Sequence, residues 1–328
     1  MPTISRRVLL SCAAAMPAAA ILSRAAFAAY PDRPVRLMVP FAAGGNVDIV
    51  ARLVGERMAE ALGQAVIVEN RAGAGGSLCA EQVARAEPDG FTLLAGSNGP
   101  LTVNPFVQAR LGYDPLKDFA PIGLTSAVPH ALAVTNSLPA KTLAELIALA
   151  KQRQVSTGTA GAGSATHLTL ERFNQQAGIK LLHVPYRGGG ALLPDLLGGA
   201  IDAAMTEFSS ILPLHREGKC RILAIAAAQR SKLTPEVPTM SEGGVKDFAA
   251  ASFVGILAPA GTPHAIVDQL QQALGKSLAA SATQERLRDL GAEVATAEQM
   301  TAAGFGAFLS EEFERSREAA QIAGLKRE

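Results

Sequence analysis

The chain has 328 residues, of which 48% are hydrophobic, and its 30 Lys and Arg nearly balance its 29 Asp and Glu. This balance excludes a protein that is drawn to nucleic acid or acidic lipid by net charge, so no nucleic-acid partner is expected. The length exceeds one ordinary hydrophobic core and predicts two lobes.

The N-terminal segment 1–28 has the pattern of a secretory signal peptide. Arg6 and Arg7 precede an alanine-rich apolar run that ends at Ala26-Phe27-Ala28, an A-x-A cleavage site. The paired arginines favour the twin-arginine route, and the general export route is the alternative. We therefore expect cleavage near Ala28 and a periplasmic product without a membrane span.

Short apolar strands then alternate with amphipathic helices, which is typical of a parallel sheet covered by helices. In the first helix we expect Ile49, Leu53, Met58 and Leu62 on the buried face. The elements expected in this first set are a strand at 35–41, a helix at 48–62, a strand at 65–69, a helix at 77–86 and a strand at 91–95.

A second set begins with Thr142-Leu-Ala-Glu145, a capping box that opens a helix. Beyond it, Thr262-Pro263 and Thr296-Ala-Glu-Gln299 are expected to open two helices that return to the first lobe. The other elements expected are strands at 155–159, 181–184, 201–205 and 221–226, helices at 165–177 and 192–197, and passages between the lobes at 126–134 and 250–259.

These elements predict an α/β fold class with two lobes joined by two crossings. Lobe 1 would comprise residues 29–128 and 256–328, and lobe 2 residues 129–255. Two crossings permit a hinge and a cleft. After signal cleavage only Cys79 and Cys220 remain. They fall in different lobes, so we expect free buried thiols in place of a disulfide.

Glycine loops follow the first strand of each set. Gly44 and Gly45 precede a helix whose free N–H groups suit an anion, and Asp48 would brace the loop or receive an ammonium group. Gly161 and Gly163 begin a similar loop in the second lobe. Each loop can also serve as a plain turn with a helix cap.

Because ligands of open α/β sheets collect at the carboxyl ends of strands, we expect the two loops to hold one anion from both sides. The predicted ligand-binding residues are Phe41, Ala43, Gly44, Gly45, Asp48, Ser97, Asn98, Gly161, Gly163, Ser164, Thr166, His167, Tyr186, Thr206 and Glu207.

Catalytic motifs are weak. Ser164 and His167 are spaced i,i+3, but no G-x-S-x-G elbow surrounds the serine and no acid is marked to orient the histidine. The five histidines lack metal-ligand spacing, and the phosphate and dinucleotide fingerprints fail. We therefore expect no catalytic residue, metal or cofactor. A secreted serine hydrolase that uses Ser164 and His167 is the alternative from another class.

Ordered motifs across the whole mature chain resemble the Bug family, the extracytoplasmic solute receptors of tripartite tricarboxylate transporters. The motifs include Tyr30-Pro-Asp-Arg-Pro34, Pro40-Phe-Ala-Ala-Gly-Gly45, His183-Val-Pro-Tyr186 and Leu257-Ala-Pro-Ala-Gly-Thr-Pro263. The resemblance implies a type II periplasmic-binding-protein fold, or Venus flytrap, that closes on a small carboxylate. It also implies that the loops 41–48 and 161–167 hold one carboxylate, and that two membrane proteins are partners. We expect a monomer.

Two departures from the family bear on the cargo. Val47 stands where members commonly have threonine, and Thr206-Glu207 stands where many have an Asp-Asn pair. An aspartate there can receive an amino group, so its absence favours a plain carboxylic acid over an amino acid. A sensory receptor that signals to a membrane kinase is a further alternative that the sequence leaves open.

Overall fold

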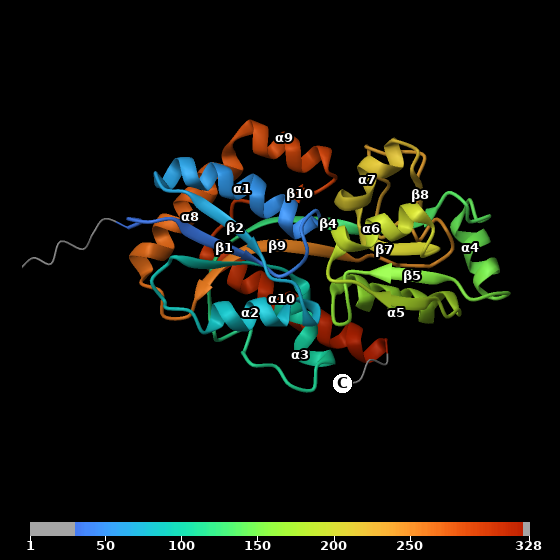
Figure 1. Ribbon diagram of the computed structural model, residues 1–328, viewed down its shortest axis with the longest axis horizontal. Coiled ribbons are helices and arrows are strands. Elements are labelled where there is room, and N and C mark those ends of the chain that lie inside the picture. Colours follow the sequence, from blue (N-terminus) through green and yellow to red (C-terminus); the bar gives the residue numbers. More distant parts are fainter. Residues whose placement is uncertain (1–29, 324–328) are drawn as a thin grey trace, which may run out of the picture.

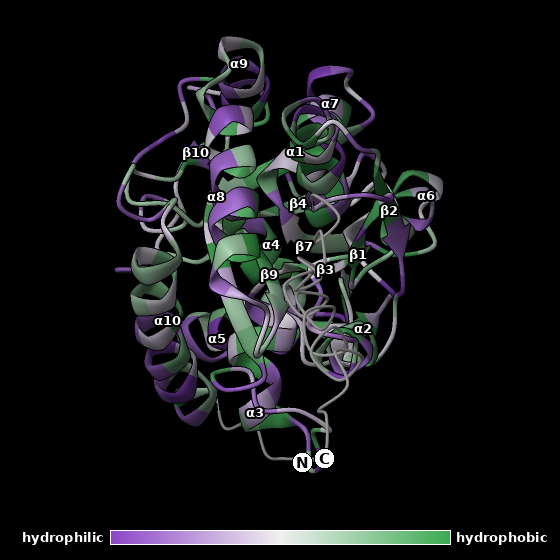
Figure 2. Ribbon diagram, turned by 90° about the vertical axis from the view of Figure 1, so that its left-hand side faces the viewer, coloured by the Kyte–Doolittle hydropathy of each residue, from purple (hydrophilic) through white to green (hydrophobic). Residues whose placement is uncertain are grey.

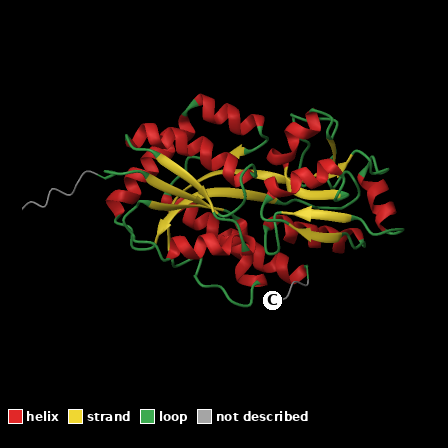
Figure 3. Ribbon diagram, in the orientation of Figure 1, coloured by secondary structure: helices red, strands yellow, loops and turns green. Residues whose placement is uncertain are grey.

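The computed structural model describes residues 30–323. The predicted signal peptide and its cleavage at Ala28 lie outside these residues. The chain folds into two α/β lobes, each built on its own part of a continuous sheet (Figures 1 and 3). The predicted two-lobe fold with two crossings is therefore confirmed.

The first part of the sheet has the strand order β2-β1-β3-β9-β4, with β10 paired to β4. Strand β1 is parallel to β2 and β3, and β9 is antiparallel to β3. Helices α1, α8 and α9 cover one face, and α2, α3 and α10 cover the other (Figure 1). The bounds are β1 Val35–Val39, α1 Asn46–Leu62, β2 Val66–Asn70, η1 Ala74–Gly76, α2 Ser77–Ala84, β3 Thr92–Gly96, η2 Gly99–Val103, α3 Asn104–Val107, β9 Ala251–Pro259, α8 His264–Ala279, α9 Ser281–Asp289, β10 Glu293–Val294 and α10 Ala302–Ile322.

The second part has the order β4-β7-β5-β6, and β8 also pairs with β4. Helices α6 and α7 cover one face, α5 covers the other, and α4 lies at the far end (Figure 1). The bounds are β4 Phe119–Thr135, α4 Leu143–Ala150, β5 Ser156–Thr159, α5 Ala165–Ala177, β6 Leu182–Pro185, α6 Gly189–Gly198, β7 Ala203–Glu207, α7 Phe208–Arg216 and β8 Cys220–Ile225.

The long strand β4 belongs to both lobes. Residues Phe119–Pro129 pair with β9, and residues His130–Val134 pair with β7. The chain returns after β8, and β9 pairs within the first part of the sheet from Ala251 onwards. The predicted boundaries between the lobes, at 128/129 and 255/256, stay a prediction.

The central strands are buried on both faces because helices cover both sides of the sheet. In β1, four of the five side chains are buried, and only Arg36 reaches solvent. Figure 2 shows the same division over the whole molecule, with hydrophobic strands in the centre and hydrophilic stretches on the outer helices. Fully burying one Val or Leu side chain stabilises the fold by about 1.5–3 kcal/mol.

The buried face of α1 differs from the prediction. Val47, Val50, Val54 and Met58 are buried, whereas Ile49, Leu53 and Leu62 remain partly exposed. Val47, Val50, Val54 and Met58 are spaced i+3 or i+4 and share one helix face, whereas Leu53 and Met58 are five residues apart and lie on different faces. Gly55 lies on the buried face, and its missing side chain lets the helix approach Val66, Val68 and Leu37 on the sheet.

The last helix also begins later than predicted. Thr296 and Gln299 do form reciprocal hydrogen bonds, of 3.0 and 3.3 Å, but these close an isolated turn. Helix α10 starts at Ala302, and the Thr301 hydroxyl caps it by accepting from Gly304 N. By contrast, the capping box at Thr142 opens α4 as predicted, since its hydroxyl accepts from Glu145 N.

Both predicted free thiols are confirmed: Cys79 and Cys220 are free and buried. Burial raises the pKa of Cys79 to about 12 and that of Cys220 to about 11. We expect neither thiol to react with iodoacetamide at pH 8 in the folded protein, and both to react in denaturant, because the thiolate is the reactive form. Mass spectrometry of the alkylated protein checks this, and labelling at equal rates in both states would contradict it.

Candidate functional site

The loop between β1 and α1 is held by a polar network around Asp48. Its carboxylate accepts from Gly44 N at 3.0 Å, from Asn70 Nδ2 at 2.9 Å and from Arg52. Asn70 Nδ2 also donates to the Phe41 carbonyl oxygen. Burial alone would raise the pKa of Asp48, but these hydrogen bonds outweigh it and hold the pKa below its usual value. Of the two roles predicted for Asp48, the structure shows the bracing one.

The main-chain N–H groups at the start of α1 have no side-chain cap. Gly45 is the N-cap residue and offers no side chain to the first turn. The N–H groups there have no intrahelical partner, and the helix dipole places partial positive charge on them. Gly44 has a φ of 80°, a conformation that favours glycine. The loop therefore presents main-chain donors towards the second lobe.

The matching loop between β5 and α5 is fixed by its own hydroxyls. Ser164 Oγ accepts from His167 N, and Thr166 Oγ1 accepts from Ala160 N. The His167 ring stacks on His183 with centroids 4.1 Å apart, and its Nδ1 accepts from Gly163 N. Burial, with a smaller effect of His183, lowers the pKa of His167 to about 4. Both hydroxyls and the neutral imidazole thus shape the loop.

The starts of α1 and α6 meet across the two lobes. Helix α6 follows Gly188 and likewise has no side-chain cap. A methyl group built on Gly45 would lie 3.3 Å from Gly190 N and 3.5 Å from Gly189 N. Two hydrogen bonds also join the lobes here. Ala42 N donates to the Arg187 carbonyl oxygen at 2.8 Å, and Ser209 Oγ donates to Asn46 Oδ1 at 2.9 Å. The lobes are therefore closed on each other here.

A cavity of about 470 Å³ lies beside this contact, between the lobes. Its side chains are mostly small or apolar, and Arg187 is the one charged residue among those that line it. The Tyr186 hydroxyl donates to Asp195 at 2.5 Å, so this tyrosine offers the cavity its ring. The lining residues are Phe41, Ala72, Gly73, Ala74, Gly75, Gly76, Leu78, Ala160, Gly161, Ala162, Tyr186 and Arg187.

A buried acid lies close to the start of α6. Glu207 accepts from Ser252 Oγ at 3.2 Å and from Thr206 Oγ1 at 3.3 Å. No cation of residues 30–323 pairs with it, and burial raises the pKa of Glu207 above its ordinary value. A methyl built on Gly189 would lie 3.0 Å from a Glu207 oxygen. The buried Ser210 hydroxyl, also near Gly189, lacks a hydrogen-bond partner within the described part of the chain.

The structure brings most of the predicted site residues to this interlobe region, in three groups. Phe41, Gly161 and Tyr186 line the cavity. Other residues form the two loops or the buried acid cluster. Ala43, Gly44, Gly45 and Asp48 belong to the first loop, Gly163, Ser164, Thr166 and His167 to the second, and Thr206 and Glu207 to the cluster. Which of them touch a ligand stays a prediction.

Ser97 and Asn98 are placed differently. Both are buried after β3, and Asn98 Oδ1 accepts from Phe253 N at 2.9 Å. Asn98 lines a second cavity, which shares no residue with the interlobe cavity. Sequence reasoning did not place Ser209, Ser210 and Ser252 in the site. In the sequence these serines are marked only by their position after a strand or in a passage between the lobes. Such a position singles out no particular residue.

Some site chemistries find no support in the described residues. No group of three or more His, Cys, Asp and Glu side chains within 30–323 is arranged to hold a metal ion. Within the same residues no helix has both the length and the apolar character needed to cross a bilayer.

The two-lobe fold and the helix starts that meet across the lobes define a solute receptor that holds its ligand between two lobes. The family model of the tripartite tricarboxylate transporter family receptor matches residues 50–325, and the chain belongs to this family.

Solved structures of similar proteins agree. The periplasmic binding protein BugD is 36% identical, with a TM-score of 0.88 over 91% of this chain and 100% of that one. Rpa4515 of Rhodopseudomonas palustris, solved with adipate, is 34% identical, with a TM-score of 0.87 over 91% and 100%. MatC from the same organism, solved with bound malate, is 36% identical, with a TM-score of 0.85 over 88% and 99%.

Proposed function

We propose that the protein is a periplasmic receptor that captures a small organic carboxylate, such as a dicarboxylate or tricarboxylate, for a tripartite tricarboxylate-type transporter. The observation that carries the proposal is the meeting of the uncapped starts of α1 and α6, one from each lobe. Partial positive charge on both favours an anion beside their contact, in the adjoining interlobe cavity. The similar receptors bound to adipate and malate support the ligand class.

Binding closes the receptor because the ligand contacts both lobes and so stabilises the closed arrangement by its differential affinity. The main-chain donors near Gly45 and Gly161 hold a carboxylate, and the Phe41 and Tyr186 rings form the walls. The protein acts as a monomer, without a cofactor. The transporter's two membrane proteins are its partners.

Recognition proceeds without chemistry. The Ser164 hydroxyl bonds to the main-chain N–H of His167 and to Thr166, whereas the His167 ring accepts from Gly163 N. No hydrogen bond within residues 30–323 joins the serine hydroxyl to the ring. The ring is therefore not placed to take the proton of this serine, as a serine hydrolase requires. This geometry supports the receptor over the hydrolase.

A thermal-unfolding screen of the mature chain tests the proposal. We expect adipate, malate or another small acid of the screen to raise the unfolding temperature, since a ligand at 100 times its Kd adds about 2.7 kcal/mol of stability. Hexane-1,6-diol is the matched control because it has the length of adipate without its charge. A screen in which no mono-, di- or tricarboxylate exceeds the diol would refute the proposal.

A further inference from the structure

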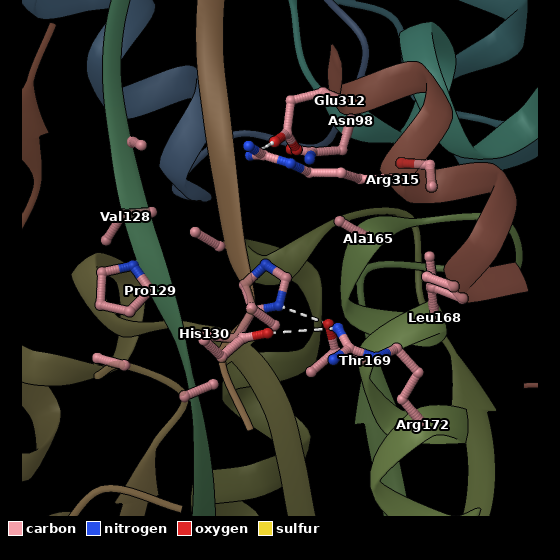
Figure 4. Close-up of a pocket in the computed structure, with 18 of the residues that line it drawn as sticks. Asn98, Val128, Pro129, His130, Ala165, Leu168, Thr169, Arg172, Glu312 and Arg315 are labelled. Atoms are coloured by element: carbon pink, nitrogen blue, oxygen red, sulfur yellow. Dashed lines mark hydrogen bonds and ion pairs between the residues drawn. The ribbon is translucent and has the colours of Figure 1, made fainter. Parts of the chain in front are cut away.

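The second cavity, of about 400 Å³, lies next to strands β4 and β9, which cross between the lobes, and between helices α5 and α10. Figure 4 shows its walls, with His130 on β4, Thr169 and Arg172 on α5, and Glu312 and Arg315 on α10. Both lobes contribute, because α5 packs on the second part of the sheet and α10 on the first. Its volume falls within the range of small-molecule sites.

Arg172 is a cation without a counter-ion in the described chain. Its Nη1 donates to the Ala249 carbonyl oxygen at 3.3 Å, and its guanidinium lies 5.0 Å from the centroid of the Phe248 ring. No carboxylate of residues 30–323 forms an ion pair with it within 4.0 Å. Burial lowers the pKa of Arg172. Because a half-buried charge is costly without a partner, the cavity favours an anion.

The other charged residues on the cavity wall do not serve as a counter-ion for Arg172. Glu312 pairs with Arg315 at 2.6 Å on their own helix, so each neutralises the other. Glu293 is exposed at the rim. Burial, with a smaller effect of Arg172, lowers the pKa of His130 to about 3, so this ring is neutral and bonds to Thr169 and Ser252. Arg172 and Glu293 are therefore the two wall charges without an ion-pair partner among residues 30–323, and of these only Arg172 is partly buried.

The rest of the wall is apolar or weakly polar. Val103, Val128, Pro129 and Leu168 contribute side chains, and nine alanines leave room beside them. A ligand that matches this lining has a single negative charge and a short apolar body. A second carboxylate would meet Glu312 or the apolar wall, where it lacks a partner.

We propose that this cavity is a second ligand site, which takes a small monocarboxylate whose carboxylate pairs with Arg172. The planar guanidinium suits a carboxylate because it can donate two parallel hydrogen bonds. The ligand's apolar body packs against Leu168 and the alanines.

Calorimetric titration of the mature protein with sodium butyrate and sodium benzoate tests this site, with sodium chloride at equal ionic strength as the blank. The variants are Arg172→Met, which removes the charge but keeps the stem over Phe248, and Ala319→Phe, which fills the cavity from α10. Arg317→Met is the control, because Arg317 pairs with Glu314 on the same helix and does not line the cavity. Circular dichroism verifies that each variant is folded.

We expect the wild type and Arg317→Met to bind at least one of the two probes, and both cavity variants to bind it about tenfold more weakly or not at all. Their response to adipate and malate should stay, which separates this site from the interlobe site. No probe binding to the wild type, or equal binding by the cavity variants, would overturn the proposal. If Arg172→Met fails to fold, Ala319→Phe decides alone.

Discussion

The Gly190→Ala variant is expected to lose most of its affinity for the carboxylate ligand while it keeps its fold. A methyl group on Gly190 would lie 2.2 Å from the Ala43 carbonyl oxygen and 2.9 Å from Gly45 N. These are main-chain atoms of the opposite lobe, so the lobes must separate to make room. Overpacking of this kind costs about 1–3 kcal/mol, which corresponds to a loss of affinity of about 5- to 150-fold.

The open form of the same variant carries no such penalty. Gly190 lies in α6 without a positive φ, and alanine suits a helix better than glycine does. We expect an unchanged or slightly raised unfolding temperature without ligand, and a larger radius of gyration by X-ray scattering in its presence than the wild type shows. Gly198→Ala is the control, because Gly198 is in the same helix with nothing within 4 Å of a built methyl group. Wild-type affinity in Gly190→Ala would show that binding does not use this closure.

The second large effect is the pH dependence of stability and of ligand affinity that Glu207 is expected to cause. Burial raises the pKa of this carboxyl above its ordinary value of 4.5, so the folded protein holds this proton more tightly than the unfolded chain does. The stability that the protonated form contributes is complete below the unfolded pKa and is lost as pH rises through the folded pKa. We expect Glu207→Gln to unfold at a higher temperature than the wild type at pH 8, and the difference to shrink towards pH 4.5.

Ligand binding should follow the same titration. Ionised Glu207 places a negative charge next to the start of α6, where the ligand's carboxylate is proposed to bind, so wild-type affinity for an acid such as adipate falls as pH rises. In Glu207→Gln the affinity should be nearly independent of pH over the part of this range in which adipate itself stays fully ionised. His130, joined to Glu207 through Ser252, stays neutral throughout, since its pKa is about 3. Glu285→Gln, an exposed site on α9, is the control, and parallel pH profiles of Glu207→Gln and the wild type would contradict this role.

Much of the fold was predictable because strands and helices alternate with clear periodicity. Helices α3, α7 and α9 and strand β10 were missed. Helix α7 contains Pro213, helix α9 has few buried residues, and α3 and β10 have only four and two residues. The buried face of α1 was predicted only in part, because Ile49 and Leu53 do not share a helix face with Met58.

The two glycine loops of the candidate site were visible in the sequence, since strand, glycines and helix follow one another locally. Of the acid cluster, Thr206 and Glu207 were predicted, but Ser252 was not, because it reaches Glu207 only through the pairing of β4 with β9 and β7. Arg172 likewise resembles any surface arginine in the sequence. Only the fold shows that it faces a cavity and that no carboxylate of residues 30–323 lies within 4.0 Å of it.

The contact between the lobes is made by glycines, and this bears on how similar receptors come to bind different ligands. Gly45, Gly189 and Gly190 bring peptide groups together, and peptide groups are the same in every sequence. Side chains that line the cavity, such as Phe41 and Tyr186, lie outside this main-chain contact. Exchanging them would therefore change the shape and polarity of the cavity and leave the contact between the lobes as it is.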